Sequence, residues 1–207
     1  MKKETENIDW LFYENSARSR GFSLICGVDE AGRGPLAGPV FAAAVVLPEG
    51  RIIEGVNDSK KLSEKKREEL YDKIIAEAYD FSIASASETE IDELNILNAT
   101  YLAMRRAVEG LKKVDYALID GNRMPPLPVE GETVIKGDAK SASIAAASIL
   151  AKVTRDRVML EMANIYPEYQ FEKHKGYGTK LHYEMLDKYG PCKIHRQTFL
   201  RTWYEKK

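Results

Sequence analysis

Apolar and polar positions along this chain of 207 residues predict short strands separated by longer helical segments. Apolar runs at Leu24–Val28 and Phe41–Leu47 have the length and composition of buried strands, although three consecutive alanines weaken the second prediction. Three glycines and two prolines lie between these runs, so we expect a shaped loop that joins two strands. Alternation at 81–86 and short apolar runs at 116–119 and 133–135 predict further strands.

Helical periodicity dominates the remaining segments. A short amphipathic helix is predicted over residues 5–19, with Ile8, Leu11 and Phe12 on the apolar face that packs on the outside of the protein. Ser63 is expected to cap a helix over residues 64–78. Other helices are predicted at 89–94, 97–111, 180–188 and near Phe199, and most clearly over the alanine-rich residues 139–163, whose small side chains would let the helix approach a sheet closely.

Four carboxylates lie at or just beyond predicted strand ends, namely Asp29, Glu30, Asp120 and Asp138. Strands that follow helices indicate a parallel α/β sheet, in which ligands bind at the carboxyl ends of the strands. Adjacent side chains of a regular strand point to opposite faces, so we expect a bend at Asp29 and Glu30 that directs both to one site. Plainer explanations are turn chemistry for Asp29, Glu30 and Asp120, and a helix N-cap for Asp138.

Grouping these acids would be costly without a metal, because like charges repel and some carboxylates would then hold protons. Divalent cations remove this repulsion, and Mg²⁺ and Mn²⁺ prefer hard oxygen ligands. Two such ions about 4 Å apart can activate water and stabilise the leaving oxygen in phosphodiester cleavage. The spacing along the chain leaves open whether the four residues converge.

Composition favours one unit over residues 1–207, with residues 165–207 as a C-terminal lobe. A hydrophobic fraction of 44% is ordinary for a soluble protein, and no apolar run of about 18 residues predicts a membrane span. The two cysteines have no metal-ligand spacing, which favours a reducing cytoplasm. From Lys136 onward, 14 Lys and Arg face 8 Asp and Glu, against 17 and 24 before it, so the basic end fits either a polyanion-binding surface or a solvated mixed surface.

Six segments, in order along the chain, closely resemble segments of ribonuclease HII, the type 2 ribonuclease H family. The resemblance covers most of the chain and implies the ribonuclease H-like fold, an α/β fold with a mixed five-stranded sheet flanked by helices and a helical C-terminal extension. The segments are Asp29-Glu30 with Gly32-Arg33-Gly34, Asp58–Ser63, Asp120-Gly121, Lys136–Ser141, Ile144–Asp156 and His174–Thr179.

The resemblance also implies an activity. The family members are endoribonucleases that hydrolyse the RNA strand of RNA/DNA hybrids and cut on the 5′ side of single ribonucleotides embedded in duplex DNA, leaving a 3′-hydroxyl and a 5′-phosphate. Asp29, Glu30, Asp120 and Asp138 match the catalytic acids of this family, which bind two Mn²⁺ or Mg²⁺ ions during catalysis. We therefore expect these four residues to be the catalytic and metal-binding residues of this chain.

Substrate-binding residues are expected from the same resemblance. Gly32, Arg33 and Gly34 match the segment that contacts the ribose 2′-hydroxyl, which is the group that distinguishes RNA from DNA. Tyr177 matches the tyrosine that stacks on the next sugar, and Lys60 is expected to contact a phosphate. From the residues alone, Tyr177 would be a packed loop aromatic and Lys60 an ordinary surface charge.

Other functions remain open. A ribonuclease HIII-like nuclease would prefer longer RNA tracts and carry an extra N-terminal domain, whereas 28 residues precede Asp29 here. A non-catalytic hybrid-binding module is the second alternative, and the complete set of four acids argues against it. We expect a monomer without an evident protein partner or membrane contact, and we interpret His174, His182 and His195 as surface or loop hydrogen-bonding residues rather than metal ligands.

Overall fold

A mixed five-stranded sheet forms the centre of the computed structural model, which describes residues 8–205. In spatial order the strands are β3 (Asp80–Ala86), β2 (Val40–Val46), β1 (Ile25–Ala31), β4 (Tyr116–Asp120) and β5 (Glu130–Val134). β1 pairs antiparallel with β2 and parallel with β4, β2 pairs antiparallel with β3, and β4 pairs parallel with β5. The predicted mixed sheet is therefore confirmed, and its parallel half brings the carboxyl ends of β1 and β4 side by side.

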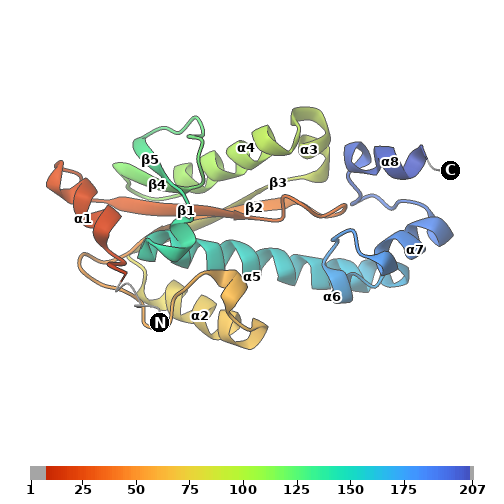
Figure 1. Cartoon of the computed structure of the whole chain (residues 1–207), viewed down its shortest axis with the longest axis horizontal. Helices are drawn as coiled ribbons and strands as arrows, with labels where there is room; N and C mark the ends of the chain where they lie inside the picture. Colours follow the sequence, from red (N-terminus) through yellow and green to blue (C-terminus); the bar gives the residue numbers. More distant parts are fainter. Residues whose placement is uncertain (1–7, 206–207) are drawn as a thin grey trace, which may run out of the picture.

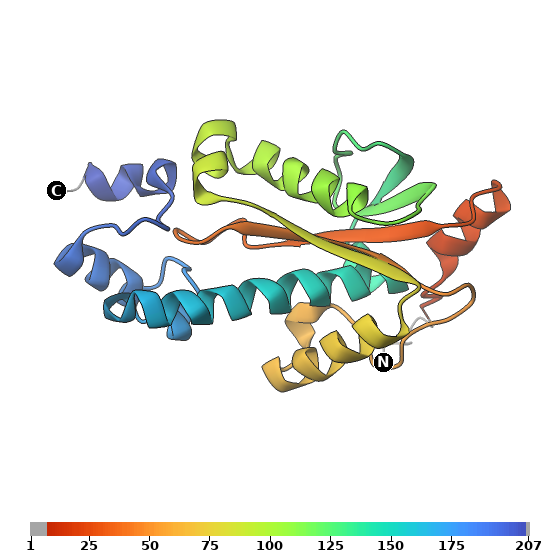
Figure 2. The ribbon, with the colours of Figure 1, turned by 180° about the vertical axis from the view of Figure 1, so that it is seen from behind.

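Helices cover both faces of this sheet, as Figures 1 and 2 show from opposite sides. One face packs against α4 (Ile96–Glu109), and the other packs against α5 (Ala142–Ile165), with α2 (Glu64–Glu77) beside it. Along β2, Ala42 and Ala44 belong to the core under α4, whereas Ala43 belongs to the core under α5. Alanines suit this strand because helices cover both of its faces and small side chains let them approach.

Close contact between α5 and β1 depends on Gly27. A Cβ added at Gly27 would lie 2.1 Å from the backbone nitrogen of Ile144, so no other residue fits without moving the helix. The prediction that small residues bring this helix close to the sheet is confirmed. The packing matters for the site because α5 and β1 carry residues on either side of it.

The first turn of α5 is held by polar side chains. The Ser141 hydroxyl oxygen accepts a hydrogen bond from the Ile144 N–H and caps the helix. The buried carboxylate of Glu14, on α1 (Phe12–Ser19), accepts hydrogen bonds from the hydroxyls of Ser141 and Ser143, each at 2.7 Å. The alternative in which Asp138 caps this helix was therefore wrong, because Ser141 has that role and the helix begins at residue 142 rather than 139.

The chain continues beyond α5 as a helical extension, which Figure 1 shows at the C-terminal end of that helix. It contains α6 (Phe171–His174), α7 (Lys180–Tyr189) and α8 (Arg201–Tyr204), which confirms the helices predicted near residues 180–188 and Phe199. Its apolar cluster includes residues of α5 and of the loop after β1. The members are Leu36, Ala37, Met159, Ala163, Tyr169, Phe171, Leu186 and Leu200.

The remaining elements complete the connections. Ser63 caps α2 as predicted, and α3 (Glu88–Leu94) precedes α4. The N-terminal helix was predicted too long, because α1 begins at Phe12. Phe12 is 58% exposed and therefore does not pack against the protein as expected. Residues 5–7 of the predicted helix lie outside the described residues. None of the described helices has the length and apolar character needed to cross a membrane. Single 3₁₀ turns are η1 (Ser59–Lys61), η2 (Gly137–Ala139), η3 (Pro167–Tyr169) and η4 (Gln197–Leu200).

Candidate active site

Three of the four predicted acids converge at the carboxyl ends of β1 and β4. Asp29 lies near the end of β1, Asp120 is the last residue of β4, and Asp138 lies in η2, just before α5. One carboxylate oxygen from each of the three lies within 4.8 Å of the others. Clustered carboxylate oxygens are the ligands that Mg²⁺ and Mn²⁺ take in proteins, so the group has the donor chemistry of a divalent-cation site.

The turn before α5 positions Asp120 and Asp138. Lys136 adopts a left-handed backbone conformation with φ of 57°, and the next residue directs its N–H at the β4 terminus. The Gly137 N–H donates to the Asp120 carboxylate over 2.6 Å. A Cβ at Gly137 would lie 2.5 Å from Cδ1 of Ile144, so a larger residue there would have to displace the end of that side chain.

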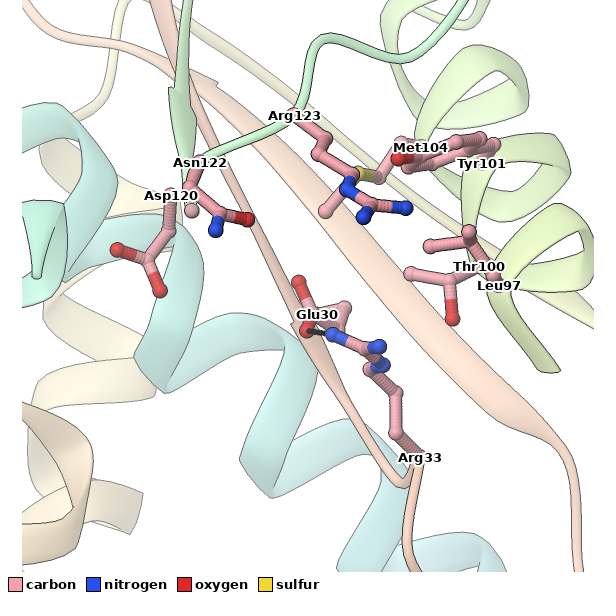
Figure 3. A pocket seen from close by; sticks show the side chains of 10 residues that line it. Glu30, Arg33, Leu97, Thr100, Tyr101, Met104, Asp120, Asn122 and Arg123 are labelled. Carbon is pink, nitrogen blue, oxygen red and sulfur yellow. Dashed lines mark hydrogen bonds and ion pairs between the residues drawn. The ribbon is translucent and has the colours of Figure 1, made fainter. Parts of the chain in front are cut away.

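Glu30 leaves β1 on the face opposite to Asp29. The expected bend between them was wrong, because the pairing with β2 stays regular, with Asp29 opposite Ala43 and Glu30 opposite Ala42. Figure 3 shows Glu30 facing a cavity beside α4, where it forms an ion pair of 3.3 Å with Arg33. Glu30 is therefore close to the three aspartates but outside their cluster.

Electrostatics of the site also fit bound cations. Burial raises the pKa of Asp29 well above its usual range, and the charges of Glu30 and Asp120 raise it further. Burial and Asp120 likewise raise the pKa of Asp138, and burial raises that of Glu30 although Arg33 opposes the shift. Bound divalent cations would compensate this repulsion and allow all four acids to be ionised together.

Lys60 stands at the rim of the acids. Its side chain is 80% exposed, and its Nζ lies 3.6 Å from Oδ2 of Asp138. Partial burial lowers the pKa of Lys60, but the attraction of Asp138 and Asp29 outweighs burial and the pKa is raised. The Lys60 N–H donates to the Asp58 side chain over 2.9 Å, which fixes the backbone of η1. The ammonium group therefore lies between the acids and the solvent.

The glycine-rich loop after β1 is held from behind by a completely buried arginine, Arg196. Its guanidinium group donates to the carbonyl oxygens of Gly32 at 2.6 Å, Arg33 at 3.0 Å and Gly38 at 2.7 Å. Burial lowers the pKa of Arg196 to about 9. Sequence analysis missed this residue, because nothing in its local pattern distinguishes it from a surface arginine.

Arg155 on α5 is the second completely buried arginine behind this loop. It donates to the carbonyl oxygens of Ala37 at 3.2 Å and Lys175 at 3.0 Å, and its guanidinium carbon lies 5.6 Å from the ring centroid of Tyr177. Gly32 has φ of 99°, and an added Cβ there would lie 2.1 Å from Nε of Arg155. One buried cation thus contacts both the glycine loop and the segment that carries Tyr177.

One cavity of about 250 Å³ is bordered by seven of the nine predicted site residues. Tyr177 is 41% exposed, and a Cβ at Gly34 would lie 3.8 Å from its ring, so the ring and the glycine loop face one another. Asp120 and Asp138 do not border this cavity, but each has a carboxylate oxygen within 4.8 Å of Asp29, which does. The predicted residues that border it are Asp29, Glu30, Gly32, Arg33, Gly34, Lys60 and Tyr177.

All three histidines form hydrogen bonds as expected, and His195 lies in a loop, but none is at the surface because all three are buried. Nδ1 of His182 lies 3.0 Å from the carbonyl oxygen of Tyr177, and its Nε2 lies 3.0 Å from Nε2 of His195. The Cys192 N–H donates to Nδ1 of His195 over 2.9 Å. These partners are satisfied when His195 donates to His182 and His182 donates to Tyr177, with both rings neutral.

Comparisons with known proteins agree with this fold. The family model for ribonuclease HII matches residues 26–207, a range that contains all nine predicted site residues. A ribonuclease HII of Caldicellulosiruptor bescii is 57% identical over 198 residues, which are 95% of this chain and 96% of that protein. One from Clostridioides difficile is 54% identical over 203 residues, 97% of this chain and 80% of that protein. The crystal structure of ribonuclease H2 from Pyrococcus horikoshii OT3 is similar with a TM-score of 0.73 and 30% identity, and the match covers 89% of this chain and 100% of that one.

Proposed function

This chain belongs to the ribonuclease HII family and is a ribonuclease H enzyme, and on that premise we propose that it cuts on the 5′ side of single ribonucleotides embedded in duplex DNA as well as within RNA/DNA hybrids. The products are a 3′-hydroxyl and a 5′-phosphate. The observation that carries the proposal is the convergence of Asp29, Asp120 and Asp138 beside a glycine-rich loop.

Asp29, Glu30, Asp120 and Asp138 would hold two Mg²⁺ or Mn²⁺ ions. When bound, such ions activate water and stabilise the leaving oxygen of a phosphodiester. The chain contributes preorganised acids: Asp29 and Asp138 are buried, and the Gly137 N–H holds the Asp120 carboxylate at 2.6 Å. Glu30 can serve the same group from the other face of β1, since its charge is close enough to raise the pKa of Asp29.

Recognition of the ribose is assigned to the loop of Gly32, Arg33 and Gly34. A 2′-hydroxyl both donates and accepts hydrogen bonds, so a backbone with free polar groups can detect it. The backbone N–H groups of Arg33 and Gly34 donate to no other residue in the described part of the chain. Arg196 holds the carbonyl side of the same loop, which leaves these N–H groups at the cavity as rigid donors.

Tyr177 is assigned to the sugar that follows the ribonucleotide. Its exposed ring faces Gly34 across the cavity, while Arg155 contacts the ring and His182 hydrogen-bonds the carbonyl of the same residue. A ring positioned through these contacts to its side chain and its backbone can test the shape of a sugar placed against it. Lys60 is assigned to a phosphate, because its exposed ammonium group stands beside the acids.

A labelled DNA duplex with one internal ribonucleotide tests the proposal. Incubation with Mg²⁺ or Mn²⁺ should give one cut on the 5′ side of the ribonucleotide and a 3′-hydroxyl end, and EDTA should abolish it. Asp120→Asn should lower the rate by more than about 100-fold, since even residues one step removed from a metal ligand commonly reach that figure. Asp72→Asn, an exposed change on α2, is the matched control. Full activity of Asp120→Asn, or a cut in the all-DNA duplex, would overturn the assignment.

A further inference from the structure

A second cavity lies on the α4 side of β1, and the proposed function gives no role to Asn122 and Arg123, which border it. Its volume is about 320 Å³. Figure 3 shows that Glu30 and Arg33 border it from the end of β1 and the following loop, α4 borders it from the right, and the loop after Asp120 borders it from above. The cavity therefore adjoins the acids on the face of the strand opposite to Asp29.

The donors in this cavity suit an anion. Figure 3 shows the guanidinium group of Arg123 and the side-chain amide of Asn122 directed into it. Neither side chain has a hydrogen bond or an ion pair with any other described residue, and both are exposed. Thr100 adds no donor, because its hydroxyl already donates to the Ile96 carbonyl over 2.7 Å.

Charge balance points the same way. Two carboxylates, Glu30 and Asp120, and two guanidinium groups, Arg33 and Arg123, border the cavity. Under the proposed function, on which this inference rests, cations compensate the carboxylates. The two guanidinium groups would then be in excess, and a guanidinium group binds phosphate oxygens through paired hydrogen bonds.

We propose that this cavity binds a phosphate group of the strand being cut, adjacent to the cleaved phosphate, with Arg123 as its principal ligand and Asn122 as a second donor. The position follows from the shared wall, because Glu30 and Arg33 border both this cavity and the one that contains Tyr177. A strand whose reacting phosphate lies at the acids passes this wall, and its neighbouring phosphate meets Arg123. The contact fixes the register of the strand without reading its bases.

Binding of the ribonucleotide-containing duplex, measured by fluorescence anisotropy with Ca²⁺ in place of Mg²⁺ to suppress turnover, tests the inference. Arg123→Gln should raise Kd by about 10-fold and lower the slope of log Kd against log salt concentration by about 1, as expected for one lost phosphate contact. Arg123→Lys should recover part of the loss. Arg51→Gln, an exposed arginine between β2 and α2 and outside both cavities, should leave Kd and the slope unchanged.

A scan with single uncharged methylphosphonates locates the phosphate. In the wild-type protein, a methylphosphonate next to the cleaved position should weaken binding about as much as Arg123→Gln does, and the two changes together should add little. An unchanged Kd in Arg123→Gln, or a loss that adds fully at every position of the scan, would overturn the inference. Failure of the wild-type protein to cut the duplex in Mg²⁺ would instead overturn the proposed function, so the two failures are distinguishable.

Discussion

The guanidinium group of Arg196 donates to the carbonyl oxygen of Gly32 over 2.6 Å, across 164 positions of the chain. The same group reaches Gly38 at the other end of the loop, so one side chain from the C-terminal extension fixes both ends. Among the described residues no carboxylate lies within ion-pair distance of Arg196; carbonyl oxygens accept its hydrogen bonds, and the Phe199 ring centroid lies 5.1 Å from its guanidinium carbon. The extension therefore builds the loop to which we assign ribose recognition.

Replacing Arg196 by lysine should disorganise this loop. An ammonium group cannot span the three carbonyls that the planar guanidinium group reaches, so we expect a loss of about 3 kcal/mol in the free energy of unfolding. Because Arg196 is a positioning residue, the ratio of cutting rates at one ribonucleotide and at a 2′-methoxy nucleotide should also fall. Urea unfolding and the duplex assay check the two effects, with the exposed Arg201→Lys as control. An unchanged ratio would leave Arg196 with a purely structural role.

The pair of His182 and His195 predicts that stability falls in mild acid. Burial lowers the pKa of each ring to about 4, so between pH 6.5 and 4 the unfolded chain binds more protons than the folded one. The free energy of unfolding should therefore decrease as pH falls through this window, by roughly 3 kcal/mol for one ring, and level off below it. The raised pKa values of the site acids act in the opposite direction.

His195→Gln isolates the histidine contribution, because it removes one titrating ring and keeps a donor for His182. Its unfolding free energy, measured in urea with EDTA from pH 4.5 to 8, should fall less steeply than that of the wild-type protein. His174, stacked on His182 with a ring-centroid distance of 4.4 Å, is present in both proteins and does not affect the comparison. Parallel curves would show that the pair does not determine the acid sensitivity.

Asp29 should reduce the stability of the metal-free protein. Its raised pKa means that the folded state favours the protonated carboxyl, so stability is lost as pH rises through that pKa. Asp29→Asn removes the charge but keeps an oxygen that can accept from the Glu30 N–H, now bonded at 2.7 Å. At pH 8 in EDTA we expect the variant to be more stable by about 1 kcal/mol, while it loses cleavage activity. Thermal unfolding in EDTA and in Mg²⁺ checks this, because Mg²⁺ should stabilise the wild-type protein and not the variant. A less stable variant in EDTA would contradict the interpretation.

Much of this site could be predicted because the ends of the predicted strands determine where its acids lie. Asp29 and Asp120 lie near or at the carboxyl ends of neighbouring parallel strands, and that placement needs only local apolar runs and a parallel sheet. Asp138 was harder, since its position depends on the left-handed backbone at Lys136, which no periodicity reveals. The direction of Glu30 was predicted wrongly because the argument required both carboxylates on one face.

Buried polar residues were beyond local pattern reasoning. Arg155 and Arg196 are buried where they donate to carbonyl oxygens of distant segments, and His182 is buried where its Nε2 meets Nε2 of His195. Partners this far along the chain are invisible in a sequence window. Burial of a charged or polar group is tolerated only where these partners exist. The site role of Tyr177 came from the family resemblance, because an isolated loop tyrosine carries no chemical signal of its own.

Gly27 provides a test of the packing that positions α5. A methyl group there would meet the backbone of Ser143 and Ile144 at 2.1 Å, and backbone cannot rotate away as a flexible side chain can. Gly27→Ala should therefore reduce the free energy of unfolding by about 3 kcal/mol, at the upper end for overpacked cores. At Gly178 the nearest atom to an added Cβ lies at 3.3 Å and belongs to a side chain, so Gly178→Ala should cost much less. Equal costs in urea unfolding would mean that α5 shifts freely on the sheet.

Lys60 and its neighbour Lys61 form a matched pair for testing the rim of the site. The Lys60 ammonium lies 3.6 Å from Asp138, whereas that of Lys61 lies 3.9 Å from Asp58. Lys60→Gln removes a positive charge beside the acids, so it should weaken duplex binding and lower the salt slope by about 1. The same change leaves the carboxylates less compensated, so the Mg²⁺ concentration at half-maximal thermal stabilisation should fall.

Opposite shifts in metal and duplex affinity are specific to a charge placed between the acids and a phosphate, because local unfolding would weaken both. Lys61→Gln makes the same change in net charge but removes an ammonium group that lies beside Asp58 and not beside Asp138, so both affinities should stay close to the wild-type values. Anisotropy with Ca²⁺ and thermal unfolding over a Mg²⁺ series supply the two measurements. If Lys60→Gln weakens both affinities, or if Lys61→Gln reproduces its effects, Lys60 is not the phosphate contact.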